Sequence, residues 1–138
     1  MGGSLNLTRG LLLASSVFLV GVGLTALFFP GTVGSAFPMI SDSSGSAFQL
    51  LAGGAIGFGL LNWVGRGAIY GGIYGRPIVV GNLGHGAIIG LVMLRWQLEP
   101  GSTGVGWVVA GAFLAYGSVF GAMLFRPPWK EGRPGVGD

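Results

Sequence analysis

Long apolar runs without any charged residue constrain this chain more than any other feature. Its seven basic and four acidic residues leave four such runs, at Leu11–Phe29, Ala47–Val64, Ile78–Leu94 and Val105–Phe125. A helix needs about 17–25 residues to cross the core of a bilayer, so each run is near the length of one transmembrane span. The sequence therefore predicts an all-α fold, an integral membrane bundle of four transmembrane helices.

We expect a single transmembrane domain over residues 1–138, with spans at about 11–29, 47–64, 77–96 and 105–125. Residues 127–138 are rich in glycine, proline and charge, which predicts an extended cytoplasmic tail. The first run is longer than the 7–15 apolar residues of a signal peptide, so we interpret it as a retained span. Only 8% of residues are charged and the mean hydropathy is +0.74, which excludes a disordered chain and disfavours an ordinary soluble domain.

Basic residues predict the orientation of the four spans. One side of the membrane would hold Arg9, Arg66, Arg76, Arg126, Lys130 and Arg133, and the other side Arg95 alone. Positive charge is concentrated on the cytoplasmic side of membrane proteins, so we expect both termini in the cytoplasm and a location in the bacterial inner membrane. The basic residues serve this purpose here, and nothing indicates a nucleic-acid partner.

Residues at the ends of the runs are typical of helix boundaries. Pro30 stops the first run, Ser46 and residues 42–44 offer caps for the second, and Pro77 fits the first turn of the third. Residues 100–103 predict a turn followed by a cap before the fourth run. Four tryptophans lie near predicted span ends, as in an interfacial aromatic belt: Trp63, Trp96, Trp107 and Trp129.

Glycine accounts for 30 of the 138 residues, and many glycines recur at a spacing of four within the runs. Small residues at this spacing allow helix backbones to approach closely in lipid. The pairs are Gly53 with Gly57, Gly86 with Gly90, and Gly117 with Gly121. They predict helix packing, either within this bundle or against another subunit.

Two loops carry further signals. Arg66, Tyr70, Tyr74 and Arg76 flank or occupy the middle loop, where they predict contact with lipid headgroups or simple anchoring at the interface. The loop between the first two runs contains an apolar stretch at residues 37–40, which we expect to dip into the interface or cover a partner.

Polar residues inside spans are the first candidates for function, because burying them in lipid is costly. Ser15, Ser16, Asn62, Asn82, His85 and Ser118 would form one layer in the cytoplasmic half. Asn82 and His85 are three residues apart and share a helix face, so both are candidate cofactor-binding residues. His85 could ligate the metal of chlorophyll or haem, or it could make an interhelical hydrogen bond or transfer protons.

Catalytic chemistry has little support in the sequence. No carboxylate lies within a run, which leaves no pair for acid–base work at membrane depth. Metal clusters lack ligands, because the chain has one histidine and no cysteine. Pumps use intramembrane Asp, Glu or Lys, and the runs contain none.

Two stretches resemble a known group of proteins. Leu51–Trp63 is glycine-rich and ends in Asn-Trp, and Arg76–His85 follows with arginine, asparagine and histidine. This pattern resembles small uncharacterised bacterial four-helix membrane proteins of the broad DoxX-like group, over about a third of the chain. The resemblance implies a four-helix membrane bundle and no single reaction.

These observations favour a non-catalytic accessory subunit that packs against a larger bacterial membrane protein complex. Membrane lipids and that complex are the expected partners, with structural lipid as a candidate ligand. Two alternatives stay open: a tetrapyrrole-binding subunit of a photosynthetic or respiratory complex that uses His85, and a small membrane enzyme or quinone-interacting protein that uses Asn62, Asn82 and His85.

Overall fold

The computed structural model describes residues 2–38, 45–67 and 75–125, and all regular elements in these ranges are helices. They are α1 (Gly2–Phe28), α2 (Pro30–Ala36), α3 (Ser46–Gly65), α4 (Gly75–Gln97) and α5 (Gly104–Phe125). Four of them are long and apolar enough to cross a membrane, over Asn6–Phe28, Ser46–Gly65, Gly75–Gln97 and Gly104–Phe125. The predicted all-α bundle with four membrane-spanning helices is confirmed.

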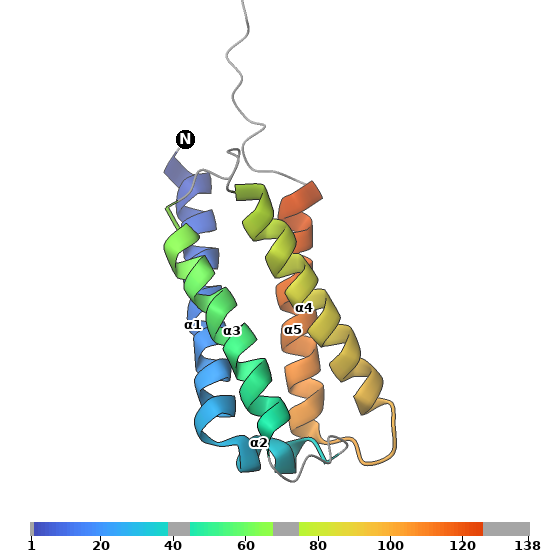
Figure 1. Cartoon of the computed structure of the whole chain (residues 1–138). Helices are drawn as coiled ribbons and strands as arrows, with labels where there is room; N and C mark the ends of the chain where they lie inside the picture. The colour runs from blue at the N-terminus through green and yellow to red at the C-terminus, as the bar shows by residue number, and fades with distance from the viewer. Residues whose placement is uncertain (1, 39–44, 68–74, 126–138) are drawn as a thin grey trace, which may run out of the picture.

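The bundle consists of two antiparallel helix pairs. α3 returns alongside α1, and α5 returns alongside α4, while contact between the pairs is much sparser. The start of α1 and the end of α5 lie at the same end of the bundle, at the top of Figure 1, which we call the N-terminal end. The short helix α2 lies across the opposite end, which we call the α2 end (Figure 1).

Glycines allow the close approach within each pair. A Cβ atom placed on Gly59 of α3 would lie 3.2 Å from the backbone oxygen of Ser16 in α1. One on Gly86 of α4 would lie 2.7 Å from the backbone nitrogen of Gly117 in α5. The distance at Gly86 is too short for a Cβ atom, and the one at Gly59 is tighter than an ordinary contact. Each pair therefore has small residues along its seam, as in many membrane helix pairs.

The connection between α1 and α3 differs from the predicted loop. Pro30 stops α1 as expected, but it also begins α2, where its missing N–H is not needed. Phe37 follows α2 and is buried in the core, with its ring centroid 6.3 Å from that of Phe48. Residue 37 of the apolar stretch therefore packs within the chain, and residues 39 and 40 lie outside the described residues.

The cap of α3 also differs from the expected serine cap. Gly45 is the N-cap residue, and no side chain makes a capping hydrogen bond. Its φ of 69° falls in the left-handed region that favours glycine, and a Cβ there would lie 2.8 Å from the Cβ of Pro30. Backbone geometry has therefore replaced side-chain capping here, while residues 42–44 lie outside the described residues.

The predicted turn and cap before the fourth span are present. Gly101 has a φ of 99°, and the Thr103 hydroxyl accepts a hydrogen bond of 3.0 Å from the backbone N–H of Gly106. The same hydroxyl donates to the backbone oxygen of Ala36 at 2.7 Å, so one threonine caps α5 and ties down the end of α2.

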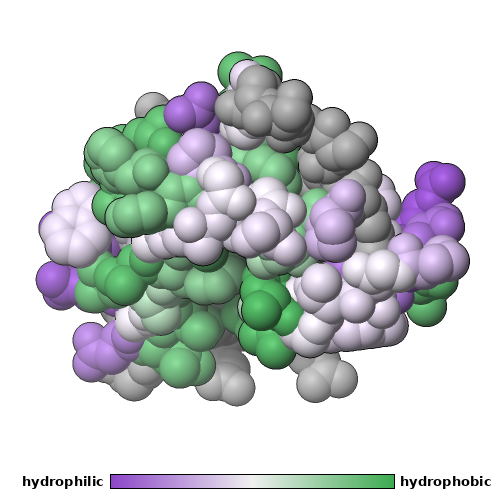
Figure 2. All heavy atoms as spheres, turned by 90° about the horizontal axis from the view of Figure 1, so that it is seen from below, coloured by the Kyte–Doolittle hydropathy of each residue, from purple (hydrophilic) through white to green (hydrophobic). Residues whose placement is uncertain are grey.

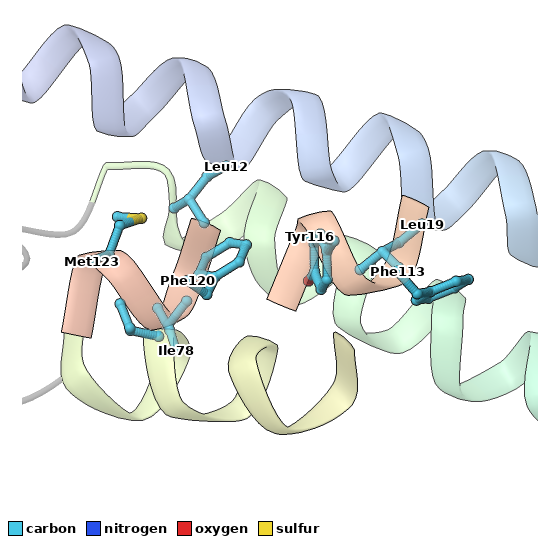
Figure 3. Packing of buried hydrophobic residues seen from close by; sticks show 8 residues of the cluster. Leu12, Leu19, Ile78, Phe113, Tyr116, Phe120 and Met123 are labelled. Atoms are coloured by element: carbon cyan, nitrogen blue, oxygen red, sulfur yellow. The ribbon is translucent and has the colours of Figure 1, made fainter. Parts of the chain in front are cut away.

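The core forms two clusters along the bundle axis. One lies toward the N-terminal end and contains Leu12, Leu19, Ile78, Val79, Phe113, Tyr116, Phe120 and Met123 (Figure 3). The other lies toward the α2 end and contains Ala26, Phe37, Phe48, Ala52, Met93 and Ala110. Large apolar side chains also cover the outside, such as Leu50 at 81% and Val64 at 79% exposure, as expected for helices facing lipid. Figure 2, seen from the α2 end, shows apolar patches next to hydrophilic residues that lie at the left and right edges.

Candidate functional site

Two buried asparagines join the helix pairs in the half of the bundle nearer the N-terminal end. Asn62 of α3 donates to Oδ1 of Asn82 at 2.8 Å, and Asn82 of α4 donates to Oδ1 of Asn62 at 2.7 Å. Both side chains are 0% exposed. The sequence predicts one polar layer that contains both residues, and the structure brings them into direct contact.

Two further side chains complete this group. The Tyr116 hydroxyl of α5 donates to Oδ1 of Asn82, and Nδ2 of Asn62 lies 3.1 Å from the Ser15 hydroxyl of α1. We call Ser15, Asn62, Asn82 and Tyr116 the amide cluster. It contains one residue from each of the four spanning helices. Tyr116 of α5 was not part of the predicted polar layer.

The side chains of the amide cluster find hydrogen-bond partners in each other and in nearby backbone oxygens. Nδ2 of Asn82 also donates to the backbone oxygen of Ile78 at 2.7 Å, and the Ser15 hydroxyl donates to that of Leu12 at 3.0 Å. Buried amides without such partners would be costly, so this arrangement stabilises one packing of the four helices. All its members are neutral amides or hydroxyls, and a substrate would have to displace hydrogen bonds that already exist.

His85 lies outside the amide cluster, about one turn further along α4. Its ring stacks on Phe58 with centroids 4.4 Å apart, and it meets the edge of Phe113 at 6.1 Å. Its Nε2 atom is buried and has no hydrogen-bond partner among the residues that the structure describes. His85 and Asn82 share a helix face, but only Asn82 joins the hydrogen-bonded group.

The surroundings of His85 leave little room for a tetrapyrrole. Nε2, a candidate axial ligand atom, is covered by protein, and Phe58 occupies one face of the imidazole ring. The space beside Gly86 is taken by α5, whereas nothing lies within 4 Å of a Cβ on Gly84. A macrocycle at Nε2 would require these helices to separate, so we derive no chemistry from such a group.

The predicted glycine pairs have different environments. Gly86, Gly90 and Gly117 lie in the α4–α5 seam, and Gly121 is in ordinary contact with Leu83. For Gly53 and Gly57 of α3, a Cβ would meet nothing within 4 Å. The spacing of four therefore serves packing inside the chain on α4 and α5, and it faces outward on α3.

The predicted headgroup residues are only partly described. The Arg66 guanidinium folds back over the Trp63 ring, 4.2 Å from its centroid, and donates to the backbone oxygen of Trp63. Arg76 is exposed in the first turn of α4. Tyr70 and Tyr74 lie outside the described residues, so the headgroup prediction stays untested for them.

A large apolar cavity lies between the helix pairs in the half of the bundle nearer α2. Its volume is about 790 Å³, and all five helices contribute to its wall. Phe18 and Phe113 line it and contact each other at 5.4 Å, and both contact Tyr116 of the amide cluster. This cavity was not predicted from the sequence, although small residues line it from three helices: Ala26, Ala52, Ala55 and Ala112.

The fold and these sites define a multi-pass membrane protein with a closed polar cluster and an apolar cavity. Comparison with protein-family models, with curated proteins and with solved structures gave no match. The DoxX-like resemblance therefore stays a prediction.

Proposed function

We propose that this chain is a non-catalytic accessory subunit of a larger bacterial membrane complex, and that the outward face of α3 docks a helix of that complex. The supporting observation is the environment of Gly53 and Gly57, where added Cβ atoms would meet nothing within 4 Å. Exposed apolar residues share this stripe at helical spacing: Leu50, Leu60 and Val64.

Other glycines of this chain show that a glycine stripe can pack closely against a neighbouring helix. Where glycines of this chain lie in a seam, helix backbones touch, as at Gly59 against α1 and Gly86 against α5. In lipid, close backbone contact replaces the hydrophobic driving force that helices have in water. The outer face of α3 offers the same shape to a partner, and no part of the described chain covers it.

The absence of carboxylates and lysines from the helices fits a structural role. The five helices carry no Asp, Glu or Lys. The amide cluster uses its donors internally, which suits it to hold helices together. Within the described residues there is no group of three or more His, Cys, Asp or Glu side chains that could hold a metal ion.

Leucine at Gly57 tests the docking face. Gly57→Leu would block a helix from approaching α3, and Gly111→Leu is the matched control, because Gly111 of α5 also meets nothing within 4 Å. In mild-detergent extracts of the native membrane, we expect the wild type and the control in one large particle. We expect Gly57→Leu to migrate as the free 14.0 kDa chain in detergent.

Two results would contradict this function. One is a wild-type particle that contains only this chain, since a larger complex must contain other subunits. The other is a particle that survives Gly57→Leu unchanged, because α3 would then not be the docking face. Helical circular dichroism of each variant separates loss of docking from loss of folding.

We further propose that the N-terminal end of the bundle faces the cytoplasm, in the bacterial inner membrane. Arg9, Arg66 and Arg76 all belong to this end, whereas Arg95 lies near the opposite end of α4. The positive-inside rule supports this orientation.

The two alternative functions have less support. The covered Nε2 atom of His85 argues against an axial ligand, and an absorption spectrum of the wild type and His85→Ala tests for bound chlorophyll or haem. An enzyme or quinone site built from Asn62, Asn82 and His85 would need His85 beside the amides. His85 instead packs between aromatic rings.

A further inference from the structure

We infer that the cavity between the helix pairs binds one acyl chain of a membrane phospholipid. The end of that chain would lie against Phe18 and Phe113, and its headgroup would lie at the level of Trp96 near the α2 end. This site is separate from the outer face of α3 and does not depend on the proposed function.

The chemistry of the wall selects a hydrocarbon. Apart from Thr25, Thr32 and Trp96, the lining residues are apolar or glycine, and all three lie toward the α2 end. The Thr25 hydroxyl already donates to the backbone oxygen of Gly21 at 2.9 Å. A polar ligand in the interior of the cavity would lose its hydrogen bonds to water without replacement, whereas an acyl chain has none to lose.

The size of the cavity also fits a ligand. A volume of about 790 Å³ falls within the range of about 300–1,000 Å³ of small-molecule sites. Lining side chains keep much of their surface free of protein contact, with Ile88 at 66% and Val108 at 72% exposure. An acyl chain in the cavity would make dispersion contacts with these lining atoms.

The position of the cavity indicates that the acyl chain comes from a membrane lipid. Its walls belong to helices that can cross a membrane, so the molecules around it at that depth are lipid tails. α2 covers the end of the cavity through Thr32, Val33 and Ala36, and Thr103 holds Ala36 in place. The acyl chain would therefore enter from the side, between the helix pairs. Trp96 lies near the end of α4, where tryptophans of membrane proteins contact lipid headgroups.

Filling the cavity from its walls tests this site. Ala112→Phe on α5 and Ala55→Leu on α3 each place a larger side chain into it. Ala115→Phe is the matched control, because Ala115 is exposed on α5 and does not line the cavity. The purified full chain and its variants are incubated with dioleoyl phosphatidylglycerol in mixed micelles, and retained lipid is counted by native mass spectrometry.

We expect one retained phospholipid per chain for the wild type and for Ala115→Phe. For the filled variants we expect affinity to fall by about tenfold or more, because apolar contact between chain and wall is lost. Equal retention in all four proteins would overturn the site. A wild type that holds no phospholipid, or that holds an apolar molecule of another mass or a second polypeptide in its place, would also overturn it. The wild-type result decides the question even if a filled variant does not fold.

Discussion

At the scale of single residues, the amide cluster carries the polar interactions inside the membrane. Asn62 and Asn82 exchange two hydrogen bonds across the helix pairs, at 2.8 and 2.7 Å. Each asparagine can be buried at low cost because the other supplies hydrogen bonds to its amide group. The energetic value of either side chain therefore depends on its partner.

Replacing both asparagines should cost less than the sum of the two single replacements. In Asn82→Leu, the Asn62 amide and the Tyr116 hydroxyl lose a partner, so we expect the free energy of unfolding to fall by about 0.6–2 kcal/mol. Unfolding in detergent, followed by circular dichroism, measures this loss.

The double variant Asn62→Leu with Asn82→Leu provides the control. Its loss should be smaller than the sum of the two single losses, since neither amide is left unpaired. Strictly additive losses would show that the two side chains act independently and would contradict the cluster.

Sequence reasoning could select the two asparagines but not the full cluster. A polar residue at a given depth is visible in the sequence, and Asn62 and Asn82 share that depth. Which residue of α5 points at them depends on the rotation of that helix about its axis, and so Tyr116 was missed. His85 lies three residues from Asn82, about 4.5 Å along the helix, which is enough to place it among aromatic rings instead.

At the scale of helices, the α4–α5 seam depends on backbone contact. A Cβ on Gly86 would lie 2.5 Å from Cδ1 of Tyr116 and 2.7 Å from the backbone nitrogen of Gly117. A side chain can move away, but the backbone of α5 can yield only if the helices separate. This seam also positions Tyr116 for the amide cluster.

Adding one methyl group at Gly86 should weaken the packing of α4 against α5. We expect Gly86→Ala to lower the free energy of unfolding by about 1–3 kcal/mol, because overpacking forces backbone shifts. The matched control is Gly84→Ala on the same helix, where nothing lies within 4 Å. That change should be neutral, or stabilise the helix by up to about 1 kcal/mol. Thermal unfolding of both variants checks this, and equal effects at the two positions would contradict the seam.

The long helices were easier to predict than the short connections, although α1 begins at Gly2, well before the expected span. Long uncharged runs and the threonine cap at Thr103 are local signals, and the structure contains the expected helices and cap. α2 has only seven residues, and most are small or polar, so no periodicity marks it. Its place depends on tertiary contacts, such as the hydrogen bond from Thr103 to Ala36 and the burial of Phe37.

At the scale of the whole molecule, the bundle is two helix pairs joined firmly in one half and separated by a cavity in the other. Hydropathy could not predict this arrangement. Both the interior and the surrounding lipid are apolar, so Leu19 at 0% exposure and Val64 at 79% carry the same signal. The number of spans could be counted from the sequence, whereas their pairing could not.

The proposed orientation makes a direct prediction for intact cells. The chain has no cysteine, so single cysteines can be introduced without background. Ser102→Cys in the α4–α5 turn should react with a membrane-impermeant maleimide applied from outside. Gly67→Cys, after α3, should react only once the inner membrane is permeabilised. The opposite pattern would place the N-terminal end outside the cell.

The arrangement in two pairs also has a consequence for how the protein is made. During synthesis α1 and α3 leave the ribosome before α4, so Asn62 reaches the bilayer before Asn82 does. In that interval the Ser15 hydroxyl, 3.1 Å away in the folded bundle, is its only cluster partner in the pair already made. The unmatched amide then favours capture of the second hairpin once it is inserted. The hydrogen bonds of the amide cluster thus favour association of the two helix pairs over their separation in the lipid.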